Sequence, residues 1–162
     1  MITIRRSLKR NESIKKFSRD HHLGLLFCWK IRQGLKGGVA LNRICKYVAY
    51  FWQQHLQSHI KDEEKILFSQ LRDRRVQRAL NEHKLISAQV QDVINDSENN
   101  KRKSLTKLAD LVDEHIHYEE RILFHHLEMK LNKEQLENIG TQIHKQRSSL
   151  QDEYEDQFWN IT

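Results

Sequence analysis

Two segments of this chain have nearly the same sequence, and their shared pattern restricts the folds that the chain can adopt. HIKDEEKILFSQL begins at His59, and HIHYEERILFHHL begins at His115. Eight of the thirteen aligned positions are identical, including the histidine, two consecutive glutamates and an Ile-Leu-Phe run. The first glutamate follows the histidine by four residues, a spacing that places both side chains on one face of a helix. We therefore expect two helices that contain the same polar pair.

The rest of the chain also favours helices. It contains no proline and five glycines, and apolar residues recur three and four positions apart. Asn132 with Gln135 predicts an N-cap for the last helix. The predicted helices are about 11–35, 39–72, 75–95, 103–130 and 133–158. Because the connections are short, we predict one all-α domain over residues 1–162: an up-down-up-down four-helix bundle over about 11–131 with an additional C-terminal helix.

Both repeats place a glutamate on an apolar helix face. On a helical wheel of about 100° per residue, Glu63 lies within the apolar stripe that contains His59. Glu119 lies in the same position relative to His115, next to Ile122. A buried carboxylate is costly unless it is paired or binds a metal, and no Lys or Arg lies on either stripe. The repeat therefore predicts two polar pairs that face a metal site.

The other bundle helices also direct histidines inward. The third helix places His83 on its apolar face, and the first places His21 there, with His22 as the alternative about 100° further round. His55 lies one turn before His59 on the inner side, where we expect either a ligand or a packing or supporting side chain. Each of the four helices thus supplies at least one histidine to the same interior.

The remaining acids and histidines are assigned to the margin of this site or to places away from it. Glu64 and Glu120 lie at the edge of the apolar stripes, where they either face solvent or orient a neighbouring histidine. His126 points inward about 16 Å along the helix from His115, too far to share its site. We expect surface or helix-packing positions for the other three: His117, His125 and His144.

Imidazole and carboxylate ligands without thiolate suit iron, manganese or zinc. A single tetrahedral zinc uses four ligands, whereas six inward side chains with two carboxylates able to bridge suit a pair of ions. Iron is the first candidate, and zinc and manganese fit the same ligand types. Cys28 and Cys45 are too few and too far apart for a disulfide framework and are predicted to be buried small side chains.

These segments, together with RDHHLGLLFCWKIRQGL and NEHKL, resemble the hemerythrin family in its HHE cation-binding branch, over about residues 18–130. The resemblance implies a four-helix bundle around a non-haem di-iron centre in which two carboxylates bridge the irons. Transferred to this chain, the implied ligands are His21, His59, Glu63, His83, His115 and Glu119, with Glu63 and Glu119 as the bridges.

The chain also departs from that family. Oxygen-carrying hemerythrins have a second histidine one turn after the third-helix ligand, and Ser87 stands there in this chain. We expect that iron to bind the exogenous ligand at an open position, unless His55 replaces the missing histidine. The ferritin-like Glu-x-x-His pattern occurs at Glu114 and His117, which the wheel places on the outer face. A ferritin-like site is therefore excluded.

The resemblance favours a protein that binds or reacts with O2, NO or peroxide for sensing, storage or detoxification, and it leaves open whether the protein is an enzyme. Gly24 faces inward, where it either leaves room for such a ligand or permits close helix packing. One alternative is an iron donor that repairs damaged iron centres, but the relatives with that role have a cysteine in an N-terminal segment and residues 1–17 contain none. Another is a basic helical binding module with a structural metal.

The net charge of +6 permits contact with nucleic acid. The basic residues are spread without interleaved aromatics, however, so we expect solvated helix faces, with DNA binding as the runner-up. The N-terminus lacks an apolar signal core and no run of about 18 apolar residues follows, so we expect a cytoplasmic protein without membrane contact. Tyr154, Phe158 and Trp159 either cap the bundle or form a contact between two copies, which predicts a monomer or a homodimer.

Overall fold

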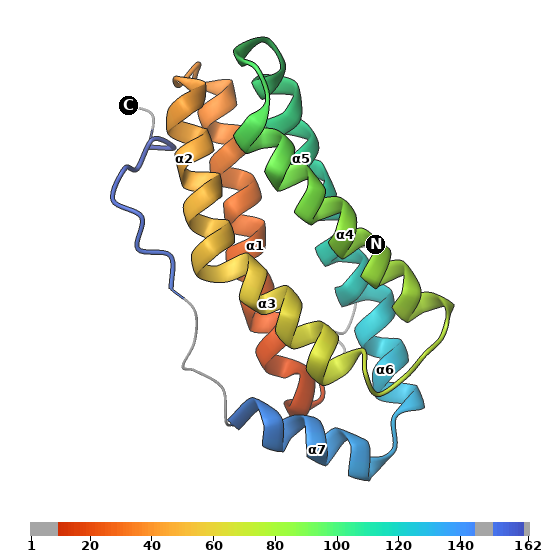
Figure 1. Cartoon of the computed structure of the whole chain (residues 1–162). Coiled ribbons are helices and arrows are strands. Elements are labelled where there is room, and N and C mark those ends of the chain that lie inside the picture. Colours follow the sequence, from red (N-terminus) through yellow and green to blue (C-terminus); the bar gives the residue numbers. More distant parts are fainter. Residues whose placement is uncertain (1–9, 145–150, 161–162) are drawn as a thin grey trace, which may run out of the picture.

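Helices form where the apolar periodicity predicts them in the computed structural model, which describes residues 10–144 and 151–160 (Figure 1). Strands are absent from these residues, which confirms the all-α prediction. Four helical runs precede a fifth helix. Their bounds are α1 Glu12–Lys36; α2 Leu41–Phe51, η1 Trp52–Leu56, α3 Gln57–Asp62 and η2 Glu63–Leu67; α4 Arg74–Asn95; α5 Glu98–Tyr118, η3 Glu119–Leu123 and α6 Phe124–Lys130; and finally α7 Lys133–His144.

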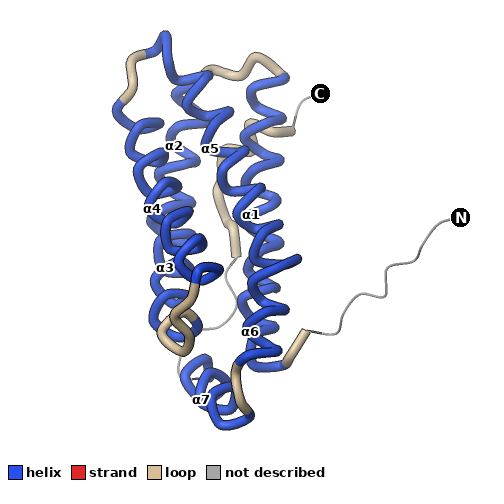
Figure 2. Tube along the Cα trace, turned by 90° about the vertical axis from the view of Figure 1, so that its right-hand side faces the viewer, coloured by secondary structure: helices blue, strands red, loops and turns tan. Residues whose placement is uncertain are grey.

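The four runs lie side by side along a common axis, and the chain turns back between them at residues 37–40, 68–73 and 96–97 (Figures 1 and 2). α1 packs against α5 and α2, and α4 packs against α5 and α2. α7 lies across one end of the runs, in contact with α1 and η2 (Figure 1). Side chains from all four runs therefore meet in the interior.

Two of the three π-helical turns begin at the glutamates of the repeat. η2 begins at Glu63 and η3 at Glu119, and in each the carbonyl of the glutamate accepts a hydrogen bond from the amide five residues later, that of Phe68 or Phe124. A π turn contains one more residue than an α turn, so the residues after it are displaced around the helix axis. Within η3, Ile122 is 43% exposed although the wheel places it inward, whereas Ile66 at the equivalent position of η2 is buried.

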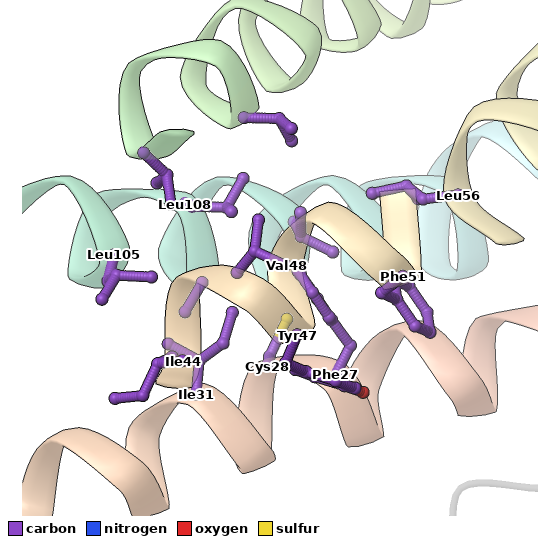
Figure 3. Packing of buried hydrophobic residues seen from close by; sticks show 14 of the residues in the cluster. Phe27, Cys28, Ile31, Ile44, Tyr47, Val48, Phe51, Leu56, Leu105 and Leu108 are labelled. Carbon is purple, nitrogen blue, oxygen red and sulfur yellow. The ribbon is translucent and has the colours of Figure 1, made fainter. Parts of the chain in front are cut away.

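Two apolar clusters fill the interior on either side of the polar repeat residues. The first cluster contains Phe27, Ile31, Tyr47, Val48 and Leu108 (Figure 3), and the second contains Ile14, Phe17, Leu67, Phe124 and Ile139 among others. Along each run the inward histidine falls between residues of the first cluster and residues of the second. The polar side chains are therefore enclosed by apolar packing.

The N-cap predicted for the last helix is confirmed. The Asn132 side chain accepts a hydrogen bond from the Gln135 amide at 2.8 Å, and the Gln135 side chain accepts one from the Asn132 amide at 3.0 Å. The fourth run begins at Glu98, five residues earlier than predicted, because residues 96–97 suffice to reverse the chain.

The prediction that the last helix continues to residue 158 is wrong. α7 ends at His144, and residues 151–160 form an irregular segment; residues 145–150 and the side chain of His144 lie outside the described part. Contacts with the bundle hold the irregular segment: Lys30 donates a hydrogen bond to Asp152 at 2.9 Å, and Phe158 is buried against Tyr47. Tyr154 and Trp159 also pack against Tyr47, so these aromatics cap the bundle. These tertiary contacts outweigh the local helical pattern.

Among the helices of the described residues, none is both long enough and apolar enough to cross a membrane.

Candidate metal centre

Six side chains from the four runs converge in the interior. α1 contributes His21, α3 and η2 contribute His59 and Glu63, α4 contributes His83, and α5 and η3 contribute His115 and Glu119. All six are buried, and both glutamates have no exposed surface. Their ligand atoms form two groups, each within 4.8 Å: Glu63, His83, His115 and Glu119 in one, and His21, His59 and Glu63 in the other. Because Glu63 belongs to both, the two groups are adjacent.

Each glutamate approaches histidines of both groups. Glu63 Oε1 lies 2.9 Å from His59 Nε2 and 3.5 Å from His83 Nε2. Glu119 Oε1 lies 3.4 Å from His83 Nε2 and closer still to His115 Nε2. Glu119 Oε2 lies 3.2 Å from His21 Nε2, in the other group. Both carboxylates are therefore placed where they could bridge two ions.

The residues fit a metal because the facing atoms of Glu63, Glu119 and His21 lack other partners. Both carboxylate oxygens of Glu63 and of Glu119, and Nε2 of His21, are buried without a hydrogen-bond partner among the described residues. The short N···O distances between them do not have hydrogen-bond geometry. Unpaired buried carboxylates are strongly unfavourable. A cation between these atoms would satisfy all of them.

An acid lies beside the outer nitrogen of each of the four histidines and is hydrogen-bonded to that of three. The Nδ1 atom of His21 lies 2.7 Å from Glu120, and that of His115 lies 2.9 Å from Glu82. The Nδ1 atom of His59 lies 3.3 Å from Asp20. For His83 the corresponding acid is Glu64, at 3.5 Å, but this Nδ1 atom has no hydrogen-bond partner among the described residues. Carboxylates in this position orient the imidazole and make its other nitrogen a better metal ligand.

These four acids form a closed ring around the bundle. Each is the sequence neighbour of one converging residue and reaches the histidine of the next run: Asp20 from α1 to α3, Glu64 from η2 to α4, Glu82 from α4 to α5, and Glu120 from η3 back to α1. An orienting role was one of the two alternatives predicted for Glu64 and Glu120. Sequence reasoning missed Asp20 and Glu82, although their positions directly before His21 and His83 were a usable signal.

The acids also set the protonation of the histidines in the absence of metal. Burial alone would lower these pKa values, but Glu63 and Asp20 raise the pKa of His59 to about 9. Glu119 and Glu63 likewise raise the pKa of His83 to about 11. Burial opposes ionisation of Glu63, yet His59 keeps its pKa well below the usual range. Protons on the imidazoles therefore balance the buried carboxylates, and a metal ion would compete with them.

The structure separates the other predicted histidines from the six. His22 is exposed, so His21 is the residue of α1 that reaches the interior. His55 is buried, but neither group of ligand atoms includes it. His126 lies between Asp73 and Arg75. His117 is half-buried beside Asp113, and His125 is half-buried as well.

A small cavity adjoins the second group of ligand atoms. Its volume is about 20 Å³, and His21, His59 and Glu63 all line it, together with His55 and Gly24. One water molecule needs about 10–15 Å³ by this measure. Ser87 is not among the lining residues. His115 of the first group lines the cavity as well, so it borders residues of both groups, and an open position at the ion next to Ser87 stays a prediction.

Close helix packing at Gly24 is confirmed, and its role in leaving room for a ligand stays a prediction. Gly24 lines the cavity, and a Cβ atom at this position would lie 2.5 Å from Cδ1 of Ile116, which also lines the cavity. A larger residue would therefore displace Ile116 or fill the space.

A comparison with protein families supports the assignment of a metal site. The family model described as the hemerythrin HHE cation binding domain matches residues 8–140, which include all six converging side chains. No curated protein and no solved structure matches the chain. The buried His and Glu groups and the family match agree on the binding of metal cations.

Proposed function

This chain belongs to the hemerythrin HHE cation-binding family, and from that premise we propose that it holds a non-haem di-iron centre that binds a small ligand such as O2, NO or peroxide. The observation that supports the proposal best is the pair of adjacent ligand groups that share Glu63. We propose that the centre lies in an up-down-up-down four-helix bundle with α7 as the additional helix. The proposed ligands are His21, His59, Glu63, His83, His115 and Glu119.

Each proposed ion would be held by two histidines, and Glu63 and Glu119 would serve both ions. His83 and His115 would hold one ion, and His21 and His59 the other, with Glu63 and Glu119 between them. Nitrogen and oxygen donors without thiolate suit iron and also accept manganese or zinc. Bound iron would supply a redox-active Lewis acid. The protein's own contribution is to orient the imidazoles through the ring of acids and to exclude water by apolar packing.

The cavity indicates where the exogenous ligand binds. It adjoins the ion proposed at His21 and His59, and its small volume selects molecules of two or three heavy atoms. Its other walls include the apolar side chains of Phe51, Val112 and Ile116. We propose that a small ligand enters this space and does not displace the histidines.

Elemental analysis of anaerobically purified protein tests the proposal, followed by absorption spectra after exposure to air and after addition of azide. We expect two irons per chain and a charge-transfer band that azide shifts. His21→Ala should lose metal, whereas the matched His22→Ala variant should retain both ions because His22 is exposed. One zinc per chain, or no metal in a folded protein, would refute the di-iron proposal.

The iron-donor alternative gains no support from the cysteines. Cys28 and Cys45 are both buried, and burial raises the pKa of Cys28 to about 12. A thiol with so high a pKa is a poor nucleophile and a poor metal ligand at neutral pH.

A further inference from the structure

His55 is a buried polar side chain whose polar atoms have no partner. Its exposed fraction is 7%, and both ring nitrogens are buried without a hydrogen bond to any residue that the structure describes. A neutral imidazole has one N–H donor and one acceptor. Buried polar groups in proteins are nearly always paired, so such a group requires an explanation. A small polar molecule beside the ring would provide one.

Packing alone holds the His55 ring. The ring of Tyr50 meets it edge-on, with centroids 5.8 Å apart and an interplanar angle of 87°. The ring of Phe51 meets it at 5.3 Å and 61°. These contacts position the imidazole without using its nitrogens, which therefore stay available to a ligand. Burial lowers the pKa of His55, in contrast to His59 one turn later, so His55 is neutral at pH 7 and has a single N–H to donate.

The ring borders the same cavity as the proposed ligands of the second ion. His55 lines this space of about 20 Å³ with His21, His59 and Glu63. The cavity is large enough for a small ligand and too small for a substrate of ordinary size. A molecule that enters it meets a metal-binding group on one part of the wall and an unpaired imidazole on another.

We propose that His55 is a hydrogen-bonding residue for a small anion in this cavity, and that it does not bind the metal. Its ring N–H donates to an acceptor atom of an anion of two or three atoms that also contacts the ion at His21 and His59. This inference rests on the proposed function, because the metal anchors the other end of the anion. Because of His55, the cavity should bind ligands that accept a hydrogen bond more tightly than ligands that do not.

The test uses azide as the probe and three variants of the full chain. His55→Phe retains the ring and its aromatic contacts but removes both nitrogens, whereas His55→Gln retains an N–H donor. His22→Phe removes an exposed histidine from α1 and serves as the control. Metal per chain and the dissociation constant for azide are measured for each. We expect full metal content throughout, azide affinity about tenfold weaker in His55→Phe, which corresponds to about 1.4 kcal/mol, and affinity within about threefold of the parent in His55→Gln.

Two results would overturn the proposal. Unchanged azide affinity in a fully metallated His55→Phe variant would show that the imidazole does not contact the anion. Loss of metal from both His55 variants would identify His55 as a metal ligand instead.

A crystal structure of the parent soaked in azide tests His55 separately from the di-iron centre. The proposed function would fail if the parent held no metal that responds to azide. In that case, or if the His55→Phe variant does not fold, this crystal structure still decides whether His55 contacts a polar molecule. Azide or water within hydrogen-bonding distance of a His55 nitrogen supports the inference. A cavity without any polar molecule beside that ring contradicts it.

Discussion

Without metal, this protein should become less stable as the pH rises from about 6.5 to 9. Glu63 and Glu119 are fully buried, and protonated imidazoles balance them. Although burial alone would lower it, Glu63 and Asp20 raise the pKa of His59 to about 9, above the unfolded value of 6.5. A group whose pKa is raised on folding contributes stability below its unfolded pKa, and that stability is lost as the pH rises through its folded pKa.

The size of the effect follows from His59 alone. With an unfolded pKa of 6.5, a folded pKa of about 9 and 1.36 kcal/mol for each pH unit, one proton contributes about 3 kcal/mol. Other histidines of the site share the same two carboxylates, so their contributions do not simply add. A loss of about 3 kcal/mol is large beside a typical unfolding free energy of about 5–15 kcal/mol.

Urea unfolding of chelator-treated protein, followed by circular dichroism at pH 6.5 and pH 9, measures this loss. The Glu63→Gln variant, which has one buried charge fewer, should show a smaller dependence on pH. Protein saturated with metal should show the opposite dependence, because protons compete with the metal for the imidazoles. Equal stability of the metal-free protein at the two pH values would refute the argument that protons balance the carboxylates.

Three further predictions follow from particular contacts. Asp152→Asn should lower the unfolding free energy by about 3 kcal/mol, since it leaves a buried lysine without its counter-charge; urea unfolding measures the loss, and an unchanged midpoint would contradict it. Glu82→Gln should weaken metal affinity about 10- to 100-fold, because the outer nitrogen of His115 loses its carboxylate partner. Competition with a chelator measures the affinity, and Glu114→Gln, at an exposed position, is the control. Gly24→Leu should slow azide binding because the cavity is filled; stopped-flow rates equal to those of the parent would exclude the cavity as the route.

The positions of the converging residues could be predicted because they depend on one helix at a time. A wheel for each helix placed His21, His59, His83 and His115 on apolar faces, and the structure buries all four. The same reasoning failed for Ile122, which is exposed in η3 although its counterpart Ile66 in η2 is buried, and it assumed α turns where the structure has π turns. Nothing in the local pattern of apolar residues distinguishes a π turn from an α turn.

The outer acids show a different limit. Asp20 and Glu82 lie beside the apolar stripe of their own helices, so a wheel assigns them to the margin of the helix. Each contacts a histidine of the next run, and that relation appears only when neighbouring helices are placed together. The helix prediction for residues 151–160 was wrong for a similar reason. Asp152 in this segment is held by Lys30, more than a hundred residues earlier in the chain.

The repeated segment and the other two helices supply the same functional unit in different ways. In the repeat, His59 and Glu63 provide a histidine and a carboxylate to the interior, and Glu64 provides the acid for the next run. In α1 the dipeptide Asp20-His21 provides one acid and one inward histidine. Every run therefore both contributes to the site and places an acid beside its neighbour's histidine. Because the ring closes, a shift of any one run would move an imidazole on the next, and metal bound at the centre would stabilise all four runs together.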